Sequence, residues 1–301
     1  MRFATGCLVP IVSIFRATEA AHGFAPEHST KSEKDYMVYY ASLLIISRDE
    51  KGDYIKCTWG KVARHGCNFL GFLLILGMYK SIIMLHEDLV VFGPPINSRS
   101  EWNSLKRFVT WELYANNMVH AILFQLYLTT YVEGLTLLWT AISGCQVDEV
   151  MKNPMFESRS PSDFWSKRWN LLIHTVLKGG VYKPVRKNGS IALACISVFL
   201  ASGLFHEFLL AVTFFEGVFI PAYGYTLAFF FWQAALIVGE ISFGRSKFFQ
   251  ILGKSLPSTA RTVLVISLGL PLAHMFSEPY ARSNFFQSGL QGVPTVLAFS
   301  D

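Results

Sequence analysis

Two adjacent ionisable side chains inside an apolar run are the residues of this sequence best suited to chemistry. His206 and Glu207 end the stretch that begins at Phe199. An ionisable group within a membrane segment is costly unless it meets water, a partner or a cavity, so such a pair indicates function. Imidazole has an unperturbed pKa of about 6.5 and can take a proton near neutral pH. His206 is therefore a candidate general base, and the structural alternative is a histidine that hydrogen-bonds between helices.

A polar stripe accompanies His206 on the predicted helix. Cys195, Ser202, His206 and Thr213 share one face at helical spacing, with Gly203 beside them. This face is expected to contact protein or a cavity instead of lipid, which makes Ser202 a candidate substrate contact. Glu207 points about 100° away and is expected to orient a neighbouring helix or the surroundings of the histidine.

Further polar positions in apolar segments are weaker candidates. Gln125, Thr129 and Glu133 recur four residues apart, a pattern more typical of hydrogen bonding between helices than of catalysis. His274 follows Pro271 and suits the lining of a kinked cavity or a structural role equally.

A predicted helix from Ser160 to Gly180 carries the second polar candidate, Asn170. Ser160 can cap this helix and Pro161 suits its first position, while Gly179-Gly180 predict its end. Its apolar positions recur at helical spacing, so the helix is expected to be amphipathic and to lie in the membrane interface on the cytosolic side. Spacing alone places Asn170 at the edge of the apolar stripe, as a solvated residue.

The chemistry requires a membrane-embedded scaffold, and the composition predicts one. Hydrophobic residues make up 52% of the chain and charged residues 16%, whereas soluble domains carry about 25% charge. A membrane helix needs about 20 mainly apolar residues. Five segments qualify as spans: Cys67 to Glu87, Leu113 to Ser143, Ser190 to Phe215, Val218 to Val238, and Thr262 to Ser277. The sequence thus predicts an all-α, multipass transmembrane helical bundle over residues 67–301, preceded by a partly interfacial N-terminal region over residues 1–66.

Basic residues support the predicted topology. With these spans alternating across the bilayer, 17 Lys and Arg fall in the loops of one side and 4 in those of the other. The positive-inside bias makes the first side cytosolic, including the long loop over residues 144–189.

Several function classes find no support. The five cysteines have no paired spacing and predict neither disulfides nor a metal site. A net charge of +5, scattered along the chain, gives no argument for nucleic acid. No nucleotide-binding glycine pattern and no nucleophile elbow is present.

Three ordered motifs carry a family resemblance. They are S-P-S-D-F-W-S-K-R-W-N (Ser160 to Asn170), V-Y-K-P-V-R (Val181 to Arg186) and F-L-A-S-G-L-F-H-E (Phe199 to Glu207). Together they resemble the membrane-bound O-acyltransferase (MBOAT) superfamily, and within it the wax synthases, which are long-chain-alcohol O-acyltransferases.

The resemblance implies an enzyme of the endoplasmic reticulum that moves a fatty acyl group from acyl-CoA to a lipophilic alcohol, without a further cofactor. It implies His206 as the catalytic histidine and Asn170 as its partner. Long-chain acyl-CoA, the alcohol and membrane lipids are the expected partners. The expected substrate contacts are Trp165, Arg168, Trp169, Lys183, Arg186, Ser202 and Glu207.

Alternatives remain open at this level. A multipass transporter would also place ionisable groups within spans, although the paired halves typical of transporters are not visible. Members of the resembling family have more spans than the five counted here, which keeps a truncated N-terminal region and a noncatalytic relative among the alternatives.

Overall fold

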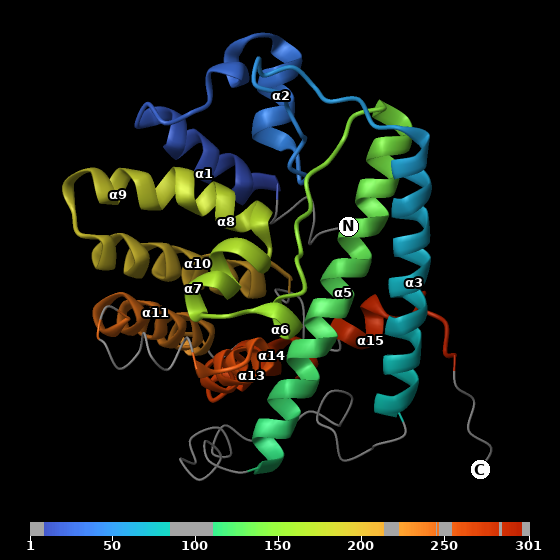
Figure 1. Cartoon of the computed structure of the whole chain (residues 1–301), viewed down its shortest axis with the longest axis vertical. Coiled ribbons are helices and arrows are strands. Elements are labelled where there is room, and N and C mark those ends of the chain that lie inside the picture. Colours follow the sequence, from blue (N-terminus) through green and yellow to red (C-terminus); the bar gives the residue numbers. More distant parts are fainter. Residues whose placement is uncertain are drawn as a thin grey trace. The chain divides into compact units, whose positions relative to one another are not determined.

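The computed structural model confirms an all-α architecture. It describes residues 9–84, 111–213, 223–244, 246, 255–282 and 285–296, and this part of the chain forms helices with three isolated β-bridges and no strand (Figure 1). The elements are α1 (Val9–Ala21), η2 (Glu27–Thr30), α2 (Glu33–Ala41), α3 (Trp59–Met84), α5 (Trp111–Ser143), α6 (Pro154–Glu157), α7 (Pro161–Asp163), η4 (Phe164–Arg168), α8 (Leu171–Leu177), η5 (Lys178–Tyr182), α9 (Lys183–Asn188), α10 (Ile191–Thr213), α11 (Tyr225–Phe243), α13 (Ser258–Gly269), α14 (Ala273–Arg282) and α15 (Phe285–Gly289). The elements η4 and η5 are π-helical turns.

Four helices are long and apolar enough to cross a membrane, namely α3, α5, α10 and α11. They correspond to the first four predicted spans. The helix α3 begins at Trp59, eight residues before the predicted start at Cys67, so Lys61 and Arg64 lie on its first turns. The predicted starting residue Val218 and the predicted ends Glu87 and Phe215 lie outside the described residues, and α11 continues past the predicted Val238 to Phe243.

The fifth predicted span is a broken one. Its residues form two helices, α13 and α14, which count as a single candidate span only when the two are taken together. The interruption falls at Leu270–Leu272, and Pro271 explains it, because proline lacks the N–H of a helical hydrogen bond and its ring clashes with the preceding turn.

The described chain falls into two compact units. One comprises residues 1–45 and 148–269, and the other comprises residues 46–147 and 270–301. The first unit holds both catalytic candidates and is called the site unit below; the second is called the α3–α5 unit. The predicted division at residue 66 separates an interfacial from an embedded region and stays a prediction.

In the α3–α5 unit, α3 and α5 lie alongside each other (Figure 1). Phe69 packs close to Gly134, and His65 Nδ1 lies 2.9 Å from Glu133 Oε2. Phe124 of α5 packs its ring against Phe276 at 5.2 Å between centroids, which fixes α14 on α5. In a membrane, lipid tails are as apolar as the side chains, so the hydrophobic effect does not drive helices together. Close packing at small residues and polar pairs of this kind hold them together instead.

In the site unit, α10 and α11 form the most extensive helix pair (Figure 1). Gly203 permits their close approach, because a Cβ at this position would lie 2.6 Å from Leu227 Cδ1 and 3.1 Å from Leu227 Cα. Glu207 then reaches the N-terminus of α11, where its Oε1 accepts hydrogen bonds from the N–H groups of Gly224 (3.1 Å) and Leu227 (3.0 Å). The carboxylate satisfies helix-end donors that an apolar environment would leave unpaired.

Gly203→Val should loosen the α10–α11 pair, because the new side chain meets backbone atoms that cannot rotate away. We expect a loss of about 1–3 kcal/mol of stability, measured as a lower melting temperature of the purified protein in detergent. Gly239→Ala on α11 is the matched control, since no atom lies within 4 Å of its added Cβ. Equal melting temperatures for Gly203→Val and the wild type would contradict this account of the packing.

Candidate functional site

The predicted helix from Ser160 to Gly180 is interrupted, which corrects the sequence interpretation. Its start is as predicted, since Ser160 Oγ accepts a hydrogen bond from Asp163 N at 3.2 Å and Pro161 follows the cap. The regular α-helix then gives way to the π-helical turn η4, and the backbone leaves helical geometry at Trp169 and Asn170 before α8 begins.

Asn170 marks the interruption with left-handed backbone angles, φ 40° and ψ 65°. Asparagine tolerates this conformation better than most residues, and neighbours outside the segment stabilise it. The N–H of Asn170 donates to Met151 Sδ at 3.1 Å, and the N–H of Leu171 donates to Val150 O at 2.9 Å. The prediction that Asn170 sits at the edge of a continuous helical stripe was therefore wrong.

The Asn170 side chain caps the following helix. Its Oδ1 accepts a hydrogen bond from Ile173 N at 3.4 Å, as expected for an N-cap residue. Its Nδ2 donates no hydrogen bond within the described part of the chain, so the amide group keeps donor capacity for a ligand.

Arg168 closes the π-helical turn with ion pairs. Its Nε donates to Asp163 Oδ2 at 2.8 Å and its Nη1 donates to Glu157 Oε2 at 2.7 Å. Partial burial opposes ionisation of Asp163, but the hydrogen bonds from Arg168 and from the N–H of Arg159 outweigh it, and the pKa of Asp163 lies below its ordinary value. The structure thus gives Arg168 intramolecular partners, and its contact with substrate stays a prediction.

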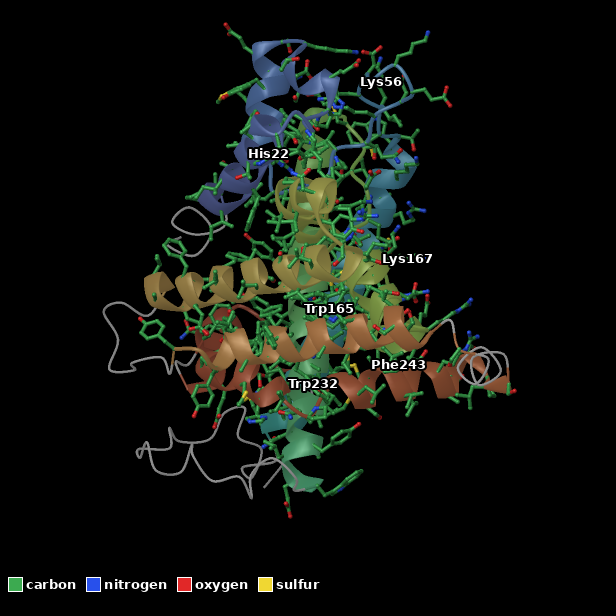
Figure 2. All side chains as sticks on the ribbon, turned by 90° about the vertical axis from the view of Figure 1, so that its left-hand side faces the viewer. His22, Lys56, Trp165, Lys167, Trp232 and Phe243 are labelled. Atoms are coloured by element: carbon green, nitrogen blue, oxygen red, sulfur yellow. The ribbon has the colours of Figure 1, made fainter. Side chains whose placement is uncertain are left out.

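An aromatic cluster connects the Asn170 segment with His206. Trp165 packs against Trp169 at 6.2 Å, Phe199 at 5.6 Å and Phe230 at 6.0 Å between ring centroids. Phe230 in turn stacks on His206 at 4.9 Å with an interplanar angle of 18°. Figure 2 labels Trp165, which lies against the α10–α11 pair. Two of the sequence candidates, Trp165 and His206, therefore contact the same phenylalanine.

His206 is half-buried on α10, with the ring of the preceding Phe205 at 4.8 Å. Ser202, one turn earlier on the same face, is buried with 6% of its surface exposed. The structure places Glu207 at the N-terminus of α11, which agrees with the expectation that it orients a neighbouring helix.

Two basic candidates, Lys183 and Arg186, lie on α9. Lys183 Nζ donates to Glu19 Oε1 of α1 at 3.0 Å, and Arg186 Nη1 donates to Gly189 O at 2.9 Å. The predicted helix stop at Gly179-Gly180 was wrong, because both residues belong to the π-helical turn η5, which continues into α9. A Cβ at Gly179 would collide with the Glu19 carboxylate, and one at Gly180 with Phe15 O, so these glycines permit close packing on α1.

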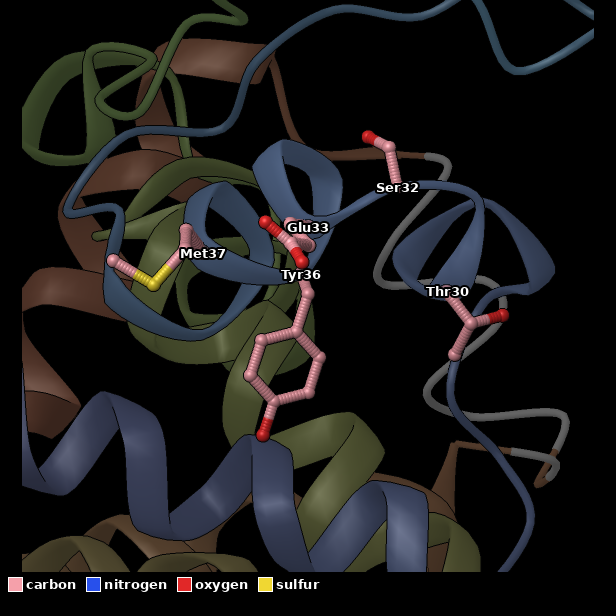
Figure 3. A pocket seen from close by; sticks show the side chains of 5 residues that line it. All are labelled: Thr30, Ser32, Glu33, Tyr36 and Met37. Carbon is pink, nitrogen blue, oxygen red and sulfur yellow. The ribbon is translucent and has the colours of Figure 1, made fainter.

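No group of three or more His, Cys, Asp and Glu side chains that could hold a metal ion occurs among the described residues. A shallow groove of about 470 Å³ is lined by Thr30, Ser32, Glu33, Tyr36 and Met37 (Figure 3). It lies on η2 and α2, elements that carry none of the candidate residues.

Residues 149–232 match the model of the membrane bound O-acyl transferase family. This matched segment contains the candidates Asn170 and His206, and also Trp165 and Phe230 of the aromatic cluster. The resemblance stated from the sequence motifs is confirmed over this segment.

Relatives from Arabidopsis thaliana agree with the family match. The chain is 32% identical over 152 residues to probable long-chain-alcohol O-fatty-acyltransferase 9, covering 46% of this chain and 43% of that protein. It is 28% identical over 134 residues to probable long-chain-alcohol O-fatty-acyltransferase 1, covering 42% and 37%. It is 26% identical over 172 residues to acyl-CoA–sterol O-acyltransferase 1, covering 53% and 46%. The matched regions span less than half the length of these curated relatives, and no solved structure matches the chain.

Two residues that hold the matched segment in place were missed from the sequence. Glu240 of α11 accepts hydrogen bonds from Ser162 N (2.8 Å) and Ser162 Oγ (2.7 Å). Gln233 lies two helical turns before Glu240 on α11. It accepts a hydrogen bond from Trp165 Nε1 at 3.2 Å and donates one to Gly269 O at 3.0 Å. Their spacing of seven places both on one face of α11, so two polar residues in an apolar helix were the available signal.

Asp163→Asn should destabilise the matched segment in a pH-dependent way. The lowered pKa means that ionised Asp163 stabilises the fold above the ordinary carboxyl pKa of about 4, and that this contribution is lost as the pH falls through the folded-state value. We expect the variant to lose about 1–3 kcal/mol at neutral pH, measured by melting in detergent, and the difference from wild type to shrink as the pH falls below about 4.

Glu157→Gln is the control for Asp163→Asn, since it removes the second partner of Arg168. The Glu157 side chain is 56% exposed and that of Asp163 is 16% exposed. Solvent screening should make the effect of Glu157→Gln the smaller one. A melting difference for Asp163→Asn that is as large at pH 3 as at pH 7 would contradict the assignment.

Proposed function

We propose that this protein is a membrane acyltransferase that moves a fatty acyl group from acyl-CoA to the hydroxyl group of a lipophilic alcohol. The observation that carries the proposal is the family match over residues 149–232, because it coincides with the segment in which Trp165, Phe230 and His206 are in contact. The similarity to a probable long-chain-alcohol O-fatty-acyltransferase and to an acyl-CoA–sterol O-acyltransferase favours an alcohol as the acceptor.

His206 is the proposed general base. Its imidazole takes the proton of the alcohol hydroxyl while the alcohol oxygen attacks the thioester carbonyl carbon, forming the new C–O bond. The C–S bond then breaks, and the proton returns from the imidazole to the departing thiolate of coenzyme A. The stack on Phe230 and the tilted ring of Phe205 restrict the imidazole, which favours one orientation towards the acceptor.

Asn170 is the proposed donor to the oxyanion. Negative charge develops on the carbonyl oxygen as the alcohol attacks, and an amide N–H fixed in advance stabilises this charge. The left-handed backbone and the cap to Ile173 N fix the Asn170 side chain through its Oδ1. Its Nδ2 keeps hydrogen-bonding capacity, which supports the role of donor.

The basic residues of the segment suit the donor substrate. Lys183 and Arg186 lie on α9, and Arg168 lies at the end of η4. Phosphate groups of coenzyme A carry charge that such side chains attract from the cytosol. With Trp165, Trp169, Ser202 and Glu207, they form the proposed set of substrate contacts and positioning groups. The proposed location is the endoplasmic reticulum membrane, where acyl-CoA and lipophilic alcohols meet.

His206→Ala should abolish ester formation while the protein remains inserted and abundant, because the proposed mechanism assigns the hydroxyl proton to His206. The measurement is lipid analysis of microsomes from a host deficient in neutral-lipid synthesis, after feeding long-chain alcohols and sterols. His174→Ala is the matched control, a second half-buried histidine of the same matched segment that has no role in the proposed mechanism. Ester formation by His206→Ala at the wild-type rate would overturn the assignment.

Asn170→Gly and Asn170→Ala together separate backbone geometry from amide chemistry. Glycine adopts the left-handed conformation readily, so Asn170→Gly should melt within about 1 kcal/mol of the wild type. Alanine resists this conformation and should cost about 1–2 kcal/mol. Loss of one donor to an oxyanion lowers turnover by about 100-fold or more, and we expect this loss in both variants in the same ester assay. Full turnover of Asn170→Gly would contradict the donor role, because it would show that residue 170 is needed only for the left-handed backbone conformation.

A further inference from the structure

The amide of Gln233 is buried between α11 and two other elements of the site unit. Gln233 is 4% exposed, in a helix long and apolar enough to cross a membrane. Its Oε1 accepts a hydrogen bond from Trp165 Nε1 at 3.2 Å, and its Nε2 donates one to Gly269 O at 3.0 Å. A buried polar group in an apolar helix is costly unless it is bonded, and here both ends of the amide are. The proposed transfer chemistry gives Gln233 no role.

The two partners fix the orientation of this amide. An indole N–H only donates and a carbonyl oxygen only accepts, so the oxygen of Gln233 must face Trp165 and the nitrogen must face Gly269. A turn of 180° would set donor against donor and acceptor against acceptor. Gln233 therefore holds the indole nitrogen of Trp165 at one defined point.

The same amide is tied to the end of α13. The last carbonyl groups of a helix have no partner within it, and in a membrane they need donors from elsewhere. Two neighbouring residues of α11 supply such donors, because Trp232 Nε1 donates to Leu268 O at 2.9 Å and Gln233 Nε2 donates to Gly269 O. Trp232 is labelled with Trp165 in Figure 2. Trp232 and Gln233 thus bond to α13 in the same way, and Gln233 bonds to Trp165 as well.

Trp165 leads from Gln233 to the proposed base. Its indole ring packs against Phe230 at 6.0 Å between centroids, and Phe230 stacks on His206 at 4.9 Å. Phe230 is 3% exposed, and rings in a close-packed interior cannot shift independently of one another. Apolar contacts tolerate several positions of an indole ring, whereas its hydrogen bond selects one. The position of the Trp165 ring therefore influences the plane of the His206 imidazole through Phe230.

We propose that Gln233 is a positioning residue, which orients the His206 imidazole through Trp165 and Phe230. The inference rests on the proposed function for the role of His206 as general base. The competing account is purely structural, with Gln233 joining α11 to α13 as polar residues commonly join membrane helices. Because Trp232 makes the same kind of bond to α13, Trp232→Phe is the matched control for that account.

The first test observes the His206 ring without substrate. The purified full-length chain in detergent is labelled with ¹³C at histidine Cε1, and the His206 signal is assigned by its absence from His206→Ala. The stacked Phe230 ring shifts this signal, so a change in the stack moves it. We expect Gln233→Leu to move the His206 signal and Trp232→Phe to leave it in place. An unmoved signal in folded Gln233→Leu would overturn the inference.

The second test measures ester formation per folded protein. We expect Gln233→Leu to lower kcat about tenfold, because small displacements of a reacting group are costly, and to change the KM for alcohol by no more than about twofold. Gln233→Glu keeps an oxygen that accepts from Trp165 and should recover most of the lost kcat. Trp232→Phe should stay within about twofold of the wild type. Equal losses of kcat in Gln233→Leu and Trp232→Phe would favour the structural account and overturn the inference.

A double-variant cycle shows whether the effect passes through the indole hydrogen bond. Trp165→Phe removes the same bond from its other end and leaves the Gln233–Gly269 bond in place. Gln233→Leu combined with Trp165→Phe should therefore lower kcat by no more than about twofold beyond Trp165→Phe alone. Losses that multiply fully would contradict transmission through this bond.

The two proposals fail in different ways. A wild-type protein that forms no ester would contradict the proposed function, and the His206 signal would still decide whether Gln233 orients the ring. Ester formation by the wild type, with an unchanged kcat in folded Gln233→Leu, would contradict the positioning role alone.

Discussion

The close approach of α10 and α11 at Gly203 is the contact on which the site unit depends. With no side chain at that position, Leu227 and Phe230 come close to the backbone of α10. This distance lets Phe230 stack on His206 and lets Glu207 reach the N–H groups at the start of α11. The remaining parts of the site attach to α11 in turn, through Gln233 and Glu240. A separation of the two helices would thus disturb the histidine, the cap and the Asn170 segment together.

Helix ends in this unit are satisfied by side chains from other elements. A carboxylate of α10 caps α11, and a carboxylate of α11 bonds to Ser162 in the first turn of α7. Asn170 caps α8 through its own amide. Water is scarce near membrane-embedded helices, so free backbone N–H groups require such partners. The short, broken helices between residues 154 and 188 are stable for this reason, although none of them would be stable alone.

Hydropathy predicted the spans well, because a run of about 20 apolar residues leaves few alternatives. The cap at Ser160 followed from local chemistry in the same way. The break at Asn170 could not be predicted, since asparagine is common on solvated helix faces and its left-handed backbone depends on Met151 and Val150, which are distant in sequence. Gly179 and Gly180 were wrongly predicted to end the helix for a similar reason. Their role is close packing against α1, which is distant in sequence. The ion pairs of Arg168 with Asp163 and Glu157 were likewise not predicted.

The pairing of α1 with η5 has a consequence for biosynthesis. Glu19 is buried beside Gly179 and bonded to Lys183, yet these partners follow it by about 160 residues. At about 5–20 residues per second, the ribosome completes them roughly 8 to 32 seconds after α1. Throughout that interval Glu19 lacks its Lys183 partner, and the early partner of both Arg16 and Glu19 is Tyr39 of α2, so α1 carries two charges that are not yet buried. These charges oppose entry of the nascent helix into the bilayer and keep it available for its late partner.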